Sequence, residues 1–456
     1  MIVSALFLAV AGFAMVAVFM TLIMTRRLSA VVALILTPVL VAGLCGFAPT
    51  MGPMIVKGLV KLAPTAAVLL FAVYYFGVMI DAGLFQPLVD RVLAMVGGDP
   101  RKVALGTAAV AAIVSLDGDG ATTAMVTITA FLPIYRQLGM NPLILAALLG
   151  SSNAIINMAP WGGPLARLAA VLQVDPNAIF LPLIPVMAVG LLGVGAIAWR
   201  LGDIERRRLG LQDLSPDGWR VDPAQTALAR PKLWWVNLGL TIAVLLAAIL
   251  RLVPLPVAFM IGFAVALTLN YPRLEDQRAR LAAHAPAVMG IVVLVFAAAT
   301  FTGILEGTGM VAEMGKAFLA VLPPSWGPHL ALVTALASGP MTFFLSNDAF
   351  FFGIVPIMAE MGQAYGIAPE AIARASLLGQ TVHVLSPLVA AVYLVAGLLN
   401  VDVGAMQRFG LKWALALMML MIAAAVAFGA VPLSGKPSAT PSAEARAVSV
   451  LARSAS

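Results

Sequence analysis

Two carboxylates interrupt a strongly apolar stretch in the first half of the chain. Residues 115–123 read Ser-Leu-Asp-Gly-Asp-Gly-Ala-Thr-Thr, so Asp117 and Asp119 lie two residues apart and each precedes a glycine. An aspartate within a bilayer costs roughly 2.5 to 3.5 kcal/mol on insertion scales, and two neighbouring aspartates also repel each other. A water-filled cavity, a bound cation or a proton would offset this cost. Each of these predicts a role in transport.

The apolar legs on either side of this segment are too short to cross a membrane. Residues 103–116 would rise about 21 Å as a helix and residues 121–135 about 22 Å, whereas a bilayer core is roughly 30 Å thick. We therefore predict a re-entrant helical hairpin with its tip near the middle of the membrane. Backbone that is not helical is tolerated at that depth only where it is buried in protein or lines a cavity.

A second polar interruption, residues 342–348, corresponds to the first. It reads Thr-Phe-Phe-Leu-Ser-Asn-Asp. A hairpin tip brings the C-terminal end of one helix beside the N-terminal end of another. The free carbonyl groups of the first can bind a cation, and the free amide groups of the second can bind an anion. We expect the two tips to form one site, with Asp348 joining the first-tip aspartates as a metal ligand and Ser346 and Asn347 binding substrate. The alternative is that these side chains only cap the hairpin legs, which is the simpler interpretation of Ser346.

A broken span after the first hairpin carries further candidates. Residues 150–167 include the sequence Pro-Trp-Gly-Gly-Pro, which ends a helix and frees backbone groups that must be buried or line a cavity. Arg167 needs a partner, and a bidentate carboxylate matches it best. The alternative is that Arg167 reaches the outer interface. The substrate-binding candidates of this span are Ser152, Asn153, Asn157, Gly162, Gly163 and Arg167.

The corresponding segment of the second half, residues 379–387, contains Thr381 and His383. Thr381 is a further substrate-binding candidate. His383 is a candidate for proton coupling, together with Asp117 and Asp119, because imidazole titrates near neutral pH. Alternatively, a lone histidine in an apolar helix is a packing residue held by a hydrogen bond.

The composition is that of a polytopic membrane protein. Of 456 residues, 62% are hydrophobic and 10% are charged, a balance that soluble globular domains do not have. The net charge of +7 does not predict nucleic-acid binding, because the basic residues lie in short loops between apolar spans. The single cysteine, Cys45, excludes an internal disulfide. We expect a multi-pass protein of the cell membrane, in bacteria the inner membrane, in contact with lipid.

The apolar spans predict an all-α fold of two inverted repeats, residues 1–200 and 233–432. Each repeat is expected to hold five transmembrane helices, including a re-entrant hairpin and a broken helix. Residues 201–232 would form a cytoplasmic linker, and residues 433–456 a disordered tail. The expected spans cover residues 2–24, 28–47, 63–80, 103–137, 141–173, 178–200, 233–251, 254–271, 286–304, 328–362, 370–399 and 411–432.

Matching signals recur in the same order in both halves, about 225 to 229 residues apart. Asp81 and Glu306 end the third spans and are interpreted as interfacial carboxylates, and Pro160 corresponds to Pro387. Loops rich in Lys and Arg define the cytoplasmic side. No Lys or Arg lies within residues 317–373, so the first hairpin should enter from inside and the second from outside. Inverted repeats with broken helices at the midplane are typical of secondary transporters.

Five short stretches carry a family resemblance. They are residues 21–30, 75–85, 116–120 (Leu-Asp-Gly-Asp-Gly), 139–142 (Gly-Met-Asn-Pro) and 160–164 (Pro-Trp-Gly-Gly-Pro). Together they resemble the metal citrate and proton symporters, the CitMHS family of the ion transporter superfamily, over about residues 1–432. The resemblance implies an elevator mechanism and a homodimer.

One departure concerns the first tip. Divalent-anion symporters of the superfamily carry Ser-Asn pairs at their hairpin tips, as residues 346–347 do here, but the first tip has Asp-Gly-Asp where they have Ser-Asn-Thr. Their sodium-site assignments therefore do not transfer to it. Carboxylates suit a divalent metal, which prefers oxygen ligands. Citrate complexed with one such metal keeps a single negative charge.

The leading prediction is a proton-driven symporter of citrate complexed with a divalent metal such as Mg²⁺ or Ca²⁺. The metal travels with the substrate, and no cofactor is expected. The alternatives are a proton- or sodium-coupled carrier of another di- or tricarboxylate, and a sodium/proton exchanger on the same scaffold. A passive channel is a further alternative. An intramembrane aspartyl protease is not expected, because Leu116 stands where its Gly-x-Gly-Asp pattern requires glycine.

Overall fold

The computed structural model describes residues 4–25, 27–118, 120–211, 228–250, 252–319 and 325–435, and all secondary structure in these residues is helical. The predicted all-α class is thus confirmed. Within the described residues, five helices are long and apolar enough to span a membrane: Ala5–Leu22, Met51–Asp81, Pro176–Leu209, Val288–Gly307 and Val403–Ala427. Asp119, most of the predicted linker and most of the predicted tail lie outside the described residues.

The helices are distributed over both halves of the chain. The first half contains α1 (Ala5–Met24), α2 (Ala30–Leu44), α3 (Met51–Asp81), α4 (Gln86–Val96), α5 (Pro100–Val114), η1 (Ser115–Asp117), α6 (Gly120–Leu138), α7 (Pro142–Ile156), α8 (Gly163–Leu172), α9 (Pro176–Phe180), η2 (Leu181–Leu183) and α10 (Ile184–Leu209). The second contains η4 (Pro231–Leu233), α12 (Trp234–Ile249), α13 (Leu255–Asn270), α14 (Leu274–Gly307), α15 (Met310–Leu319), η5 (Gly327–His329), α16 (Leu330–Phe344), η6 (Ala349–Ile354), α17 (Val355–Ala364), α18 (Pro369–Leu377), α19 (Gln380–His383), α20 (Ala390–Leu399) and α21 (Val403–Ala427).

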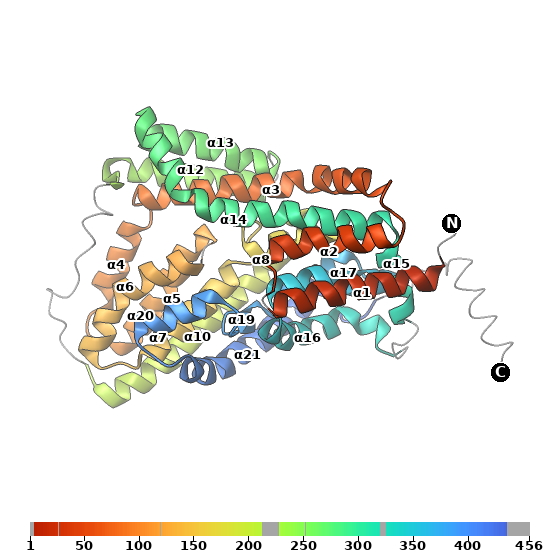
Figure 1. The fold of residues 1–456 in the computed structure, drawn as a ribbon. Helices are drawn as coiled ribbons and strands as arrows, with labels where there is room; N and C mark the ends of the chain where they lie inside the picture. Colours follow the sequence, from red (N-terminus) through yellow and green to blue (C-terminus); the bar gives the residue numbers. More distant parts are fainter. Residues whose placement is uncertain are drawn as a thin grey trace.

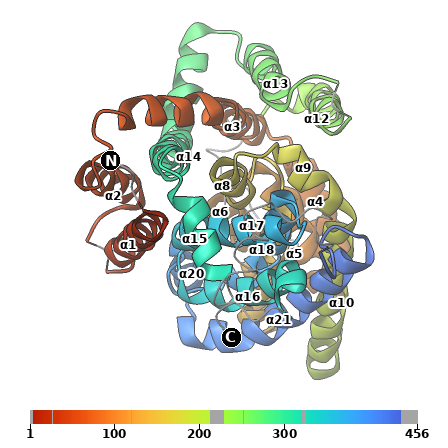
Figure 2. The ribbon, with the colours of Figure 1, turned by 90° about the vertical axis from the view of Figure 1, so that its right-hand side faces the viewer.

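The helices form two groups, which we call the arc and the body. The arc contains the first three helices of each half, α1–α3 and α12–α14, and it lies along one side of the body, which contains α4–α10 and α15–α21 (Figures 1 and 2). In the arc, α3 packs against both α13 and α14, and α2 packs against α14. Helix α8 of the body contacts α3 and α14, so α8 lies at the boundary between the two groups.

Glycines allow α3 and α14 to pack with their backbones in contact. A Cβ atom on Gly58 would lie 2.3 Å from the carbonyl oxygen of Ala299, and one on Gly303 would lie 2.6 Å from that of Met54. Any larger residue would force the helices apart, because these contacts are to backbone rather than to flexible side chains. Small residues at such crossings are usual where lipid-embedded helices pack closely.

Both predicted hairpins are present. The first is α5 and α6, joined through η1, and the second is α16 followed by η6 and α17. The first tip turns at Gly118, whose φ of +79° is a left-handed conformation that favours glycine. Asp99 begins α5 by accepting a hydrogen bond from the backbone N–H of Arg101, and Asn141 begins α7 in the same way. Side-chain caps thus define where the legs start.

The predicted linker begins later than expected. Helix α10 continues to Leu209, through the first part of the segment predicted as linker. The charged residues there pair along the helix, Arg207 with Asp203 at 2.9 Å and Arg208 with Glu205 at 2.5 Å. Pairs at these spacings stabilise a helix in water, which explains why it extends beyond the apolar span.

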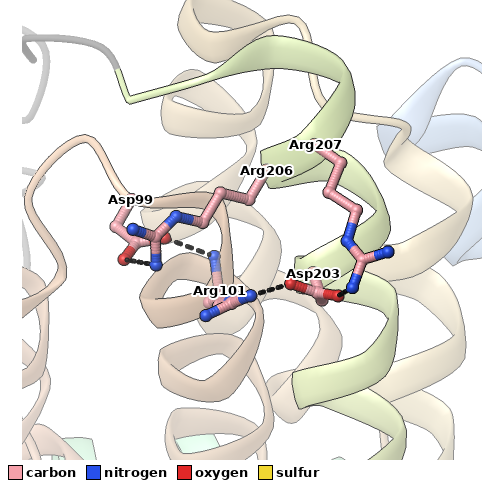
Figure 3. Close-up of polar contacts among 5 residues, drawn as sticks. All are labelled: Asp99, Arg101, Asp203, Arg206 and Arg207. Atoms are coloured by element: carbon pink, nitrogen blue, oxygen red, sulfur yellow. Dashed lines mark hydrogen bonds and ion pairs between the residues drawn. The ribbon is translucent and has the colours of Figure 1, made fainter.

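Ion pairs join the base of the first hairpin to α10. Figure 3 shows Asp99 and Arg101, at the start of α5, facing Asp203, Arg206 and Arg207 of α10. Arg206 Nη1 lies 3.3 Å from Asp99 Oδ2, and Arg101 pairs with Asp203. The side chain of Asp203 is only 17% exposed and that of Asp99 15%, so these contacts are partly shielded from solvent. The hairpin and α10 are therefore fastened together at this end.

Candidate functional site

The two hairpin tips and the two broken spans meet at one cavity of 540 Å³. This volume lies within the usual range for small-molecule sites. The first tip contributes Gly118 and Gly120, and the second contributes Asn347. The other polar residues in its lining are Asn153, Asn157, Arg167, Gln380 and His383. The expectation that both tips form one site is therefore consistent with the structure.

The first tip is held by the broken span that follows it. The indole Nε1 of Trp161 donates a hydrogen bond of 2.8 Å to the carbonyl oxygen of Leu116, and Asn153 Nδ2 donates one of 3.2 Å to Ser115 Oγ. Asp117, between these two anchors, is 5% exposed and directly precedes the cavity-lining Gly118. The tip backbone is thus fixed at the cavity wall.

The chain between α7 and α8 makes a tight turn of which Gly162 is an essential part. A Cβ atom on Gly162 would lie 2.0 Å from the carbonyl oxygen of Asn157. The Asn157 side chain lines the cavity, and its Oδ1 is buried without a hydrogen-bond partner among the described residues. A buried acceptor of this kind is costly unless a water or ligand satisfies it.

Arg167 and Asp348 form an ion pair across the cavity wall. Arg167 Nε lies 2.7 Å from Asp348 Oδ1, and the two side chains are 21% and 18% exposed. Arg167 therefore has a carboxylate partner, which comes from the second hairpin tip and is held through one contact rather than the bidentate pair that we predicted. The pairing favours a place for Arg167 beside the cavity over the alternative that it extends to the outer interface.

The second tip is held by an amide pair that sequence reasoning missed. Asn347 Nδ2 donates to Gln380 Oε1 at 3.3 Å, and Gln380 Nε2 donates to Asn347 Oδ1 at 3.0 Å. Gln380 was not among the candidates, although it directly precedes Thr381 in the segment that matches the first broken span. Ser346 Oγ accepts a hydrogen bond of 3.1 Å from the backbone N–H of Ala349. Ser346 is thus a cap, as its simpler interpretation held.

The predicted substrate ligands Ser152 and Thr381, like Ser346, do not line the cavity. Ser152 Oγ donates to the carbonyl oxygen of Ala108 at 3.0 Å, and Thr381 Oγ1 donates to that of Ala414 at 3.2 Å. Both residues are fully buried. Their hydroxyl groups join neighbouring helices, because a hydroxyl inside a helix bundle is readily satisfied by a backbone carbonyl. Gly162 likewise shapes the turn without lining the cavity, whereas Gly163 lines it.

His383 lines the cavity and is also held by the backbone. Its Nδ1 lies 2.8 Å from the carbonyl oxygen of Thr342. Because a carbonyl only accepts, Nδ1 carries the hydrogen, and Nε2 is the nitrogen that can gain or lose a proton. Both sequence-based interpretations, packing residue and proton carrier, are compatible with this geometry.

The remaining acidic candidates lie elsewhere. Asp81 accepts from Arg280 at 3.0 Å and contacts His284 at 2.8 Å, and Glu306 lies 3.6 Å from Lys61. Asp81 and Glu306 thus have ion-pair partners at helix ends, away from the cavity. In the described part of the chain, which leaves out Asp119, no group of three His, Cys, Asp or Glu side chains is placed to hold a metal ion.

Comparison with known proteins decides the family. The profile of the CitMHS family, described as "Citrate transporter", matches residues 3–379. The chain belongs to this citrate transporter family. A citrate transporter of Bacillus subtilis (strain 168) is 50% identical over 424 residues, which cover 92% of this chain and 99% of that protein. The Mg(2+)/citrate complex secondary transporter of the same organism is 46% identical over 431 residues, 94% of this chain and all of that protein.

Membership in the citrate transporter family has two consequences. The family and these relatives are transporters, so the enzyme alternative is excluded. Together with the apolar spanning helices, bacterial relatives indicate a multi-pass protein of the cell membrane.

Solved structures support the fold. The Alcanivorax borkumensis YdaH transporter, whose structure is described as having an unusual topology, aligns with a TM-score of 0.57 over 85% of this chain and 90% of its own, at 17% identity. Neisseria gonorrhoeae MtrF, assigned to a class of antimetabolite efflux pumps, aligns with a TM-score of 0.60 over 87% of both chains, at 16% identity. At these identities the likeness shows the fold alone.

We predict that the amide pair at the second tip acts as a unit. Gln380→Ala and Asn347→Ala should each lower citrate uptake by about tenfold, because each leaves one amide, half-buried at Asn347 or buried at Gln380, without its partner, at about 1–3 kcal/mol. The double variant should lose much less than the product of the single losses, with a coupling of about 0.5–3 kcal/mol. Uptake of labelled citrate into proteoliposomes, compared among wild type, the two single variants and the double variant, measures this coupling. Gln86→Ala, which removes an exposed contact to Asp90 on α4, is the control; independent effects of the two amides would refute the prediction.

Proposed function

We propose that this protein is a secondary active transporter that carries citrate complexed with a divalent metal, together with protons. The observation that carries the proposal is the cavity at which both hairpin tips and both broken spans meet. It is supported by the relative named as a Mg(2+)/citrate complex secondary transporter. The metal is part of the substrate.

The charge of the cavity matches that of a metal–citrate complex. Arg167 supplies a cation in the lining, and Asp348 offsets it. A purely cationic pocket would favour the free trianion, whereas this mixed site favours a complex in which the metal has cancelled most of the charge. Amide groups of Asn153, Asn157 and Asn347 would bind carboxylate oxygens or water.

The shape of the cavity supports an inward-open state. Besides the two tips, its lining includes Ala146 and Leu149 of α7, Val395 of α20 and Met406 near the start of α21. Arg136, shortly before α7, and Arg408, near the start of α21, are among the basic residues that the charge rule assigns to the cytoplasm. In an elevator mechanism the body would move against the arc, with α8 at the sliding boundary. The inverted repeat and the homodimer are parts of this proposal.

Protons would bind at groups beside the cavity. Asp117 and His383 are the described candidates, and Asp119 belongs with them by sequence. Neighbouring titratable groups share their protons as a coupled set, so no proton is assigned to one residue. His383 Nε2 is suited to this role because its other nitrogen is fixed by the carbonyl oxygen of Thr342.

Uptake of labelled citrate into proteoliposomes tests the proposed function. We expect uptake to rise with Mg²⁺ or Ca²⁺, to fall to background with EDTA, and to be driven by an inward proton gradient that a protonophore collapses. Uptake that is independent of metal would contradict the metal–citrate substrate. Uptake driven by a sodium gradient alone would favour the sodium-coupled alternative, and competition by other di- or tricarboxylates would favour a different physiological substrate.

A further inference from the structure

The Arg167–Asp348 pair uses only one edge of each group. The contact joins Nε of the guanidinium group to Oδ1 of the carboxylate. A guanidinium group has five N–H donors, and a carboxylate has two oxygens. Among the described residues neither side chain makes a second hydrogen bond or ion pair. The Nη edge of Arg167 and the Oδ2 atom of Asp348 therefore remain for a ligand.

Arg167 lies in the cavity lining, and Asp348 lies directly beside that lining. Arg167 is part of the lining, and its Nη1 passes so close to Gly163, another lining residue, that a Cβ atom there would lie 2.8 Å from it. Asp348 directly follows Asn347, which is also in the lining, and its side chain is 18% exposed. A donor fork in the lining and the carboxylate that pairs with it, one residue beyond the lining, thus form an adjacent positive and negative group.

We propose that this pair recognises the metal and a carboxylate of the substrate together, and that Asp348 is the residue that makes transport depend on metal. The Nη edge of Arg167 would bind a substrate carboxylate, in the forked geometry that guanidinium groups prefer. Asp348 Oδ2 would ligate the divalent cation next to that carboxylate, since Mg²⁺ and Ca²⁺ take carboxylate oxygens. This inference rests on the proposed function and deepens it.

Rejection of free citrate follows from the same arrangement. A citrate without metal would bring its carboxylates against Asp348 with no cation between them. Specificity is often built from such a repulsive contact as well as from an attractive one. The carboxylate at 348 would therefore act in two ways, by binding the complex and by excluding the free anion.

A purely structural role for Asp348 makes a different prediction. If the carboxylate only positioned Arg167, asparagine would largely replace it, because its side-chain oxygen still accepts a hydrogen bond from Nε. Asp348→Asn would then keep the dependence on metal. If Asp348 ligates the metal, the same variant loses the charge that the metal needs and the repulsion that excludes free citrate.

The experiment compares wild type with Asp348→Asn in proteoliposomes, at fixed citrate, across a Mg²⁺ series that begins in EDTA. For wild type, uptake should rise at least about tenfold from EDTA to saturating metal. For Asp348→Asn, we expect uptake with metal to fall by about tenfold or more, the range typical of lost metal-site interactions. Uptake in EDTA should at the same time equal or exceed uptake with metal. A preserved ratio between the two conditions would overturn the inference.

Asp402→Asn is the matched control. Asp402 begins α21, where its Oδ1 accepts a hydrogen bond of 2.8 Å from the backbone N–H of Ala405, and asparagine is an equally good cap. This variant should keep both the rate and the metal dependence of wild type. A loss of metal dependence in Asp402→Asn as well would overturn the assignment to Asp348.

A second measurement decides the case in which Asp348→Asn transports nothing. Thermal unfolding of the purified variant is followed with citrate in EDTA and with citrate plus Mg²⁺. Stabilisation by citrate in EDTA supports the inference, whereas stabilisation only with Mg²⁺, or by neither ligand, overturns it. Wild-type uptake that needs no metal would instead refute the proposed function itself, so the two failures are distinguishable.

Discussion

Arg167→Gln is expected to reduce citrate uptake by about 100-fold. The change removes the cation that would bind a substrate carboxylate and leaves Asp348, which is only 18% exposed, without its ion-pair partner. Hydrogen bonds to charged groups contribute about 1.5–3 kcal/mol, and each 1.4 kcal/mol is about a factor of ten. Initial rates of labelled uptake, normalised to the amount of reconstituted protein, measure the effect.

The control for this prediction is Arg207→Gln. Arg207 lies on α10 outside the cavity, and its side chain is 80% exposed. When the Arg207 guanidinium group is removed, Asp203 still has Arg101 as an ion-pair partner. We expect uptake by this variant to stay within about twofold of wild type, because exposed ion pairs contribute little. Uptake by Arg167→Lys should lie between that of Arg167→Gln and that of Arg207→Gln, because lysine keeps the positive charge but lacks the forked N–H donors of a guanidinium group. Uptake by Arg167→Gln close to that of wild type would remove Arg167 from the site.

Gly162→Ala is expected to abolish uptake and to lower the thermal stability of the protein. The added methyl group would lie 2.0 Å from the carbonyl oxygen of Asn157 and 2.8 Å from its Oδ1. Neither distance is tolerable, so the turn between α7 and α8 must open and displace α8, which carries Arg167. The backbone itself suits alanine, with φ of −75°, so the steric contact alone causes the effect. Overpacking of this kind typically costs about 1–3 kcal/mol.

A matched glycine elsewhere provides the comparison. Gly195 lies within α10, and a Cβ atom there would meet no other atom within 4 Å. Gly195→Ala should leave uptake unchanged and raise stability slightly, because alanine favours a helix by about 1 kcal/mol over glycine. Thermal unfolding in detergent, followed by size-exclusion chromatography with fluorescence detection, measures both variants. Equal behaviour of the two alanine variants would show that the turn tolerates the methyl group.

The hairpins were predictable because they follow from energetics alone. Carboxylates at Asp117 and Asp348 within short apolar legs have few solutions in a bilayer, and the structure has a pair of helices around each of these residues. The need of Arg167 for a carboxylate was predictable for the same reason. Which carboxylate it finds was not, because Asp348 lies 181 positions away in the sequence and only the packed fold brings the two together.

Hydroxyl and amide side chains were harder to assign. Ser152 and Thr381 have the chemistry of a ligand, but in the structure each donates to a backbone carbonyl of a neighbouring helix. Sequence cannot distinguish these uses, because both need a polar atom at the same depth. Gln380 was missed for the converse reason. The role of Gln380 depends on its hydrogen bonds to Asn347. A pairing between two side-chain amides leaves no recognisable pattern in the sequence.

Helix ends also departed from the expected spans. The span predicted at residues 63–80 is part of α3, which already begins at Met51. Lys57, Lys61 and Pro64 interrupt the apolar run that defines a span, yet the helix passes through all three. Hydropathy indicates only the part of a helix that lies in hydrocarbon. Helix α3 extends further, because it also packs against α14 at Gly58, outside the apolar run.

The ion pairs that fasten the first hairpin to α10 restrict how the cavity can change shape. Asp99 and Arg101 could not swing away from Arg206 and Asp203 without exposing unmatched charges in a partly shielded place. Helix α20 forms no ion pair among the described residues, and four of its residues, Ala391, Val392, Leu394 and Val395, line the cavity. Moving α20 would therefore separate no opposite charges, so the α20 wall of the cavity can change shape at a lower electrostatic cost than the hairpin can.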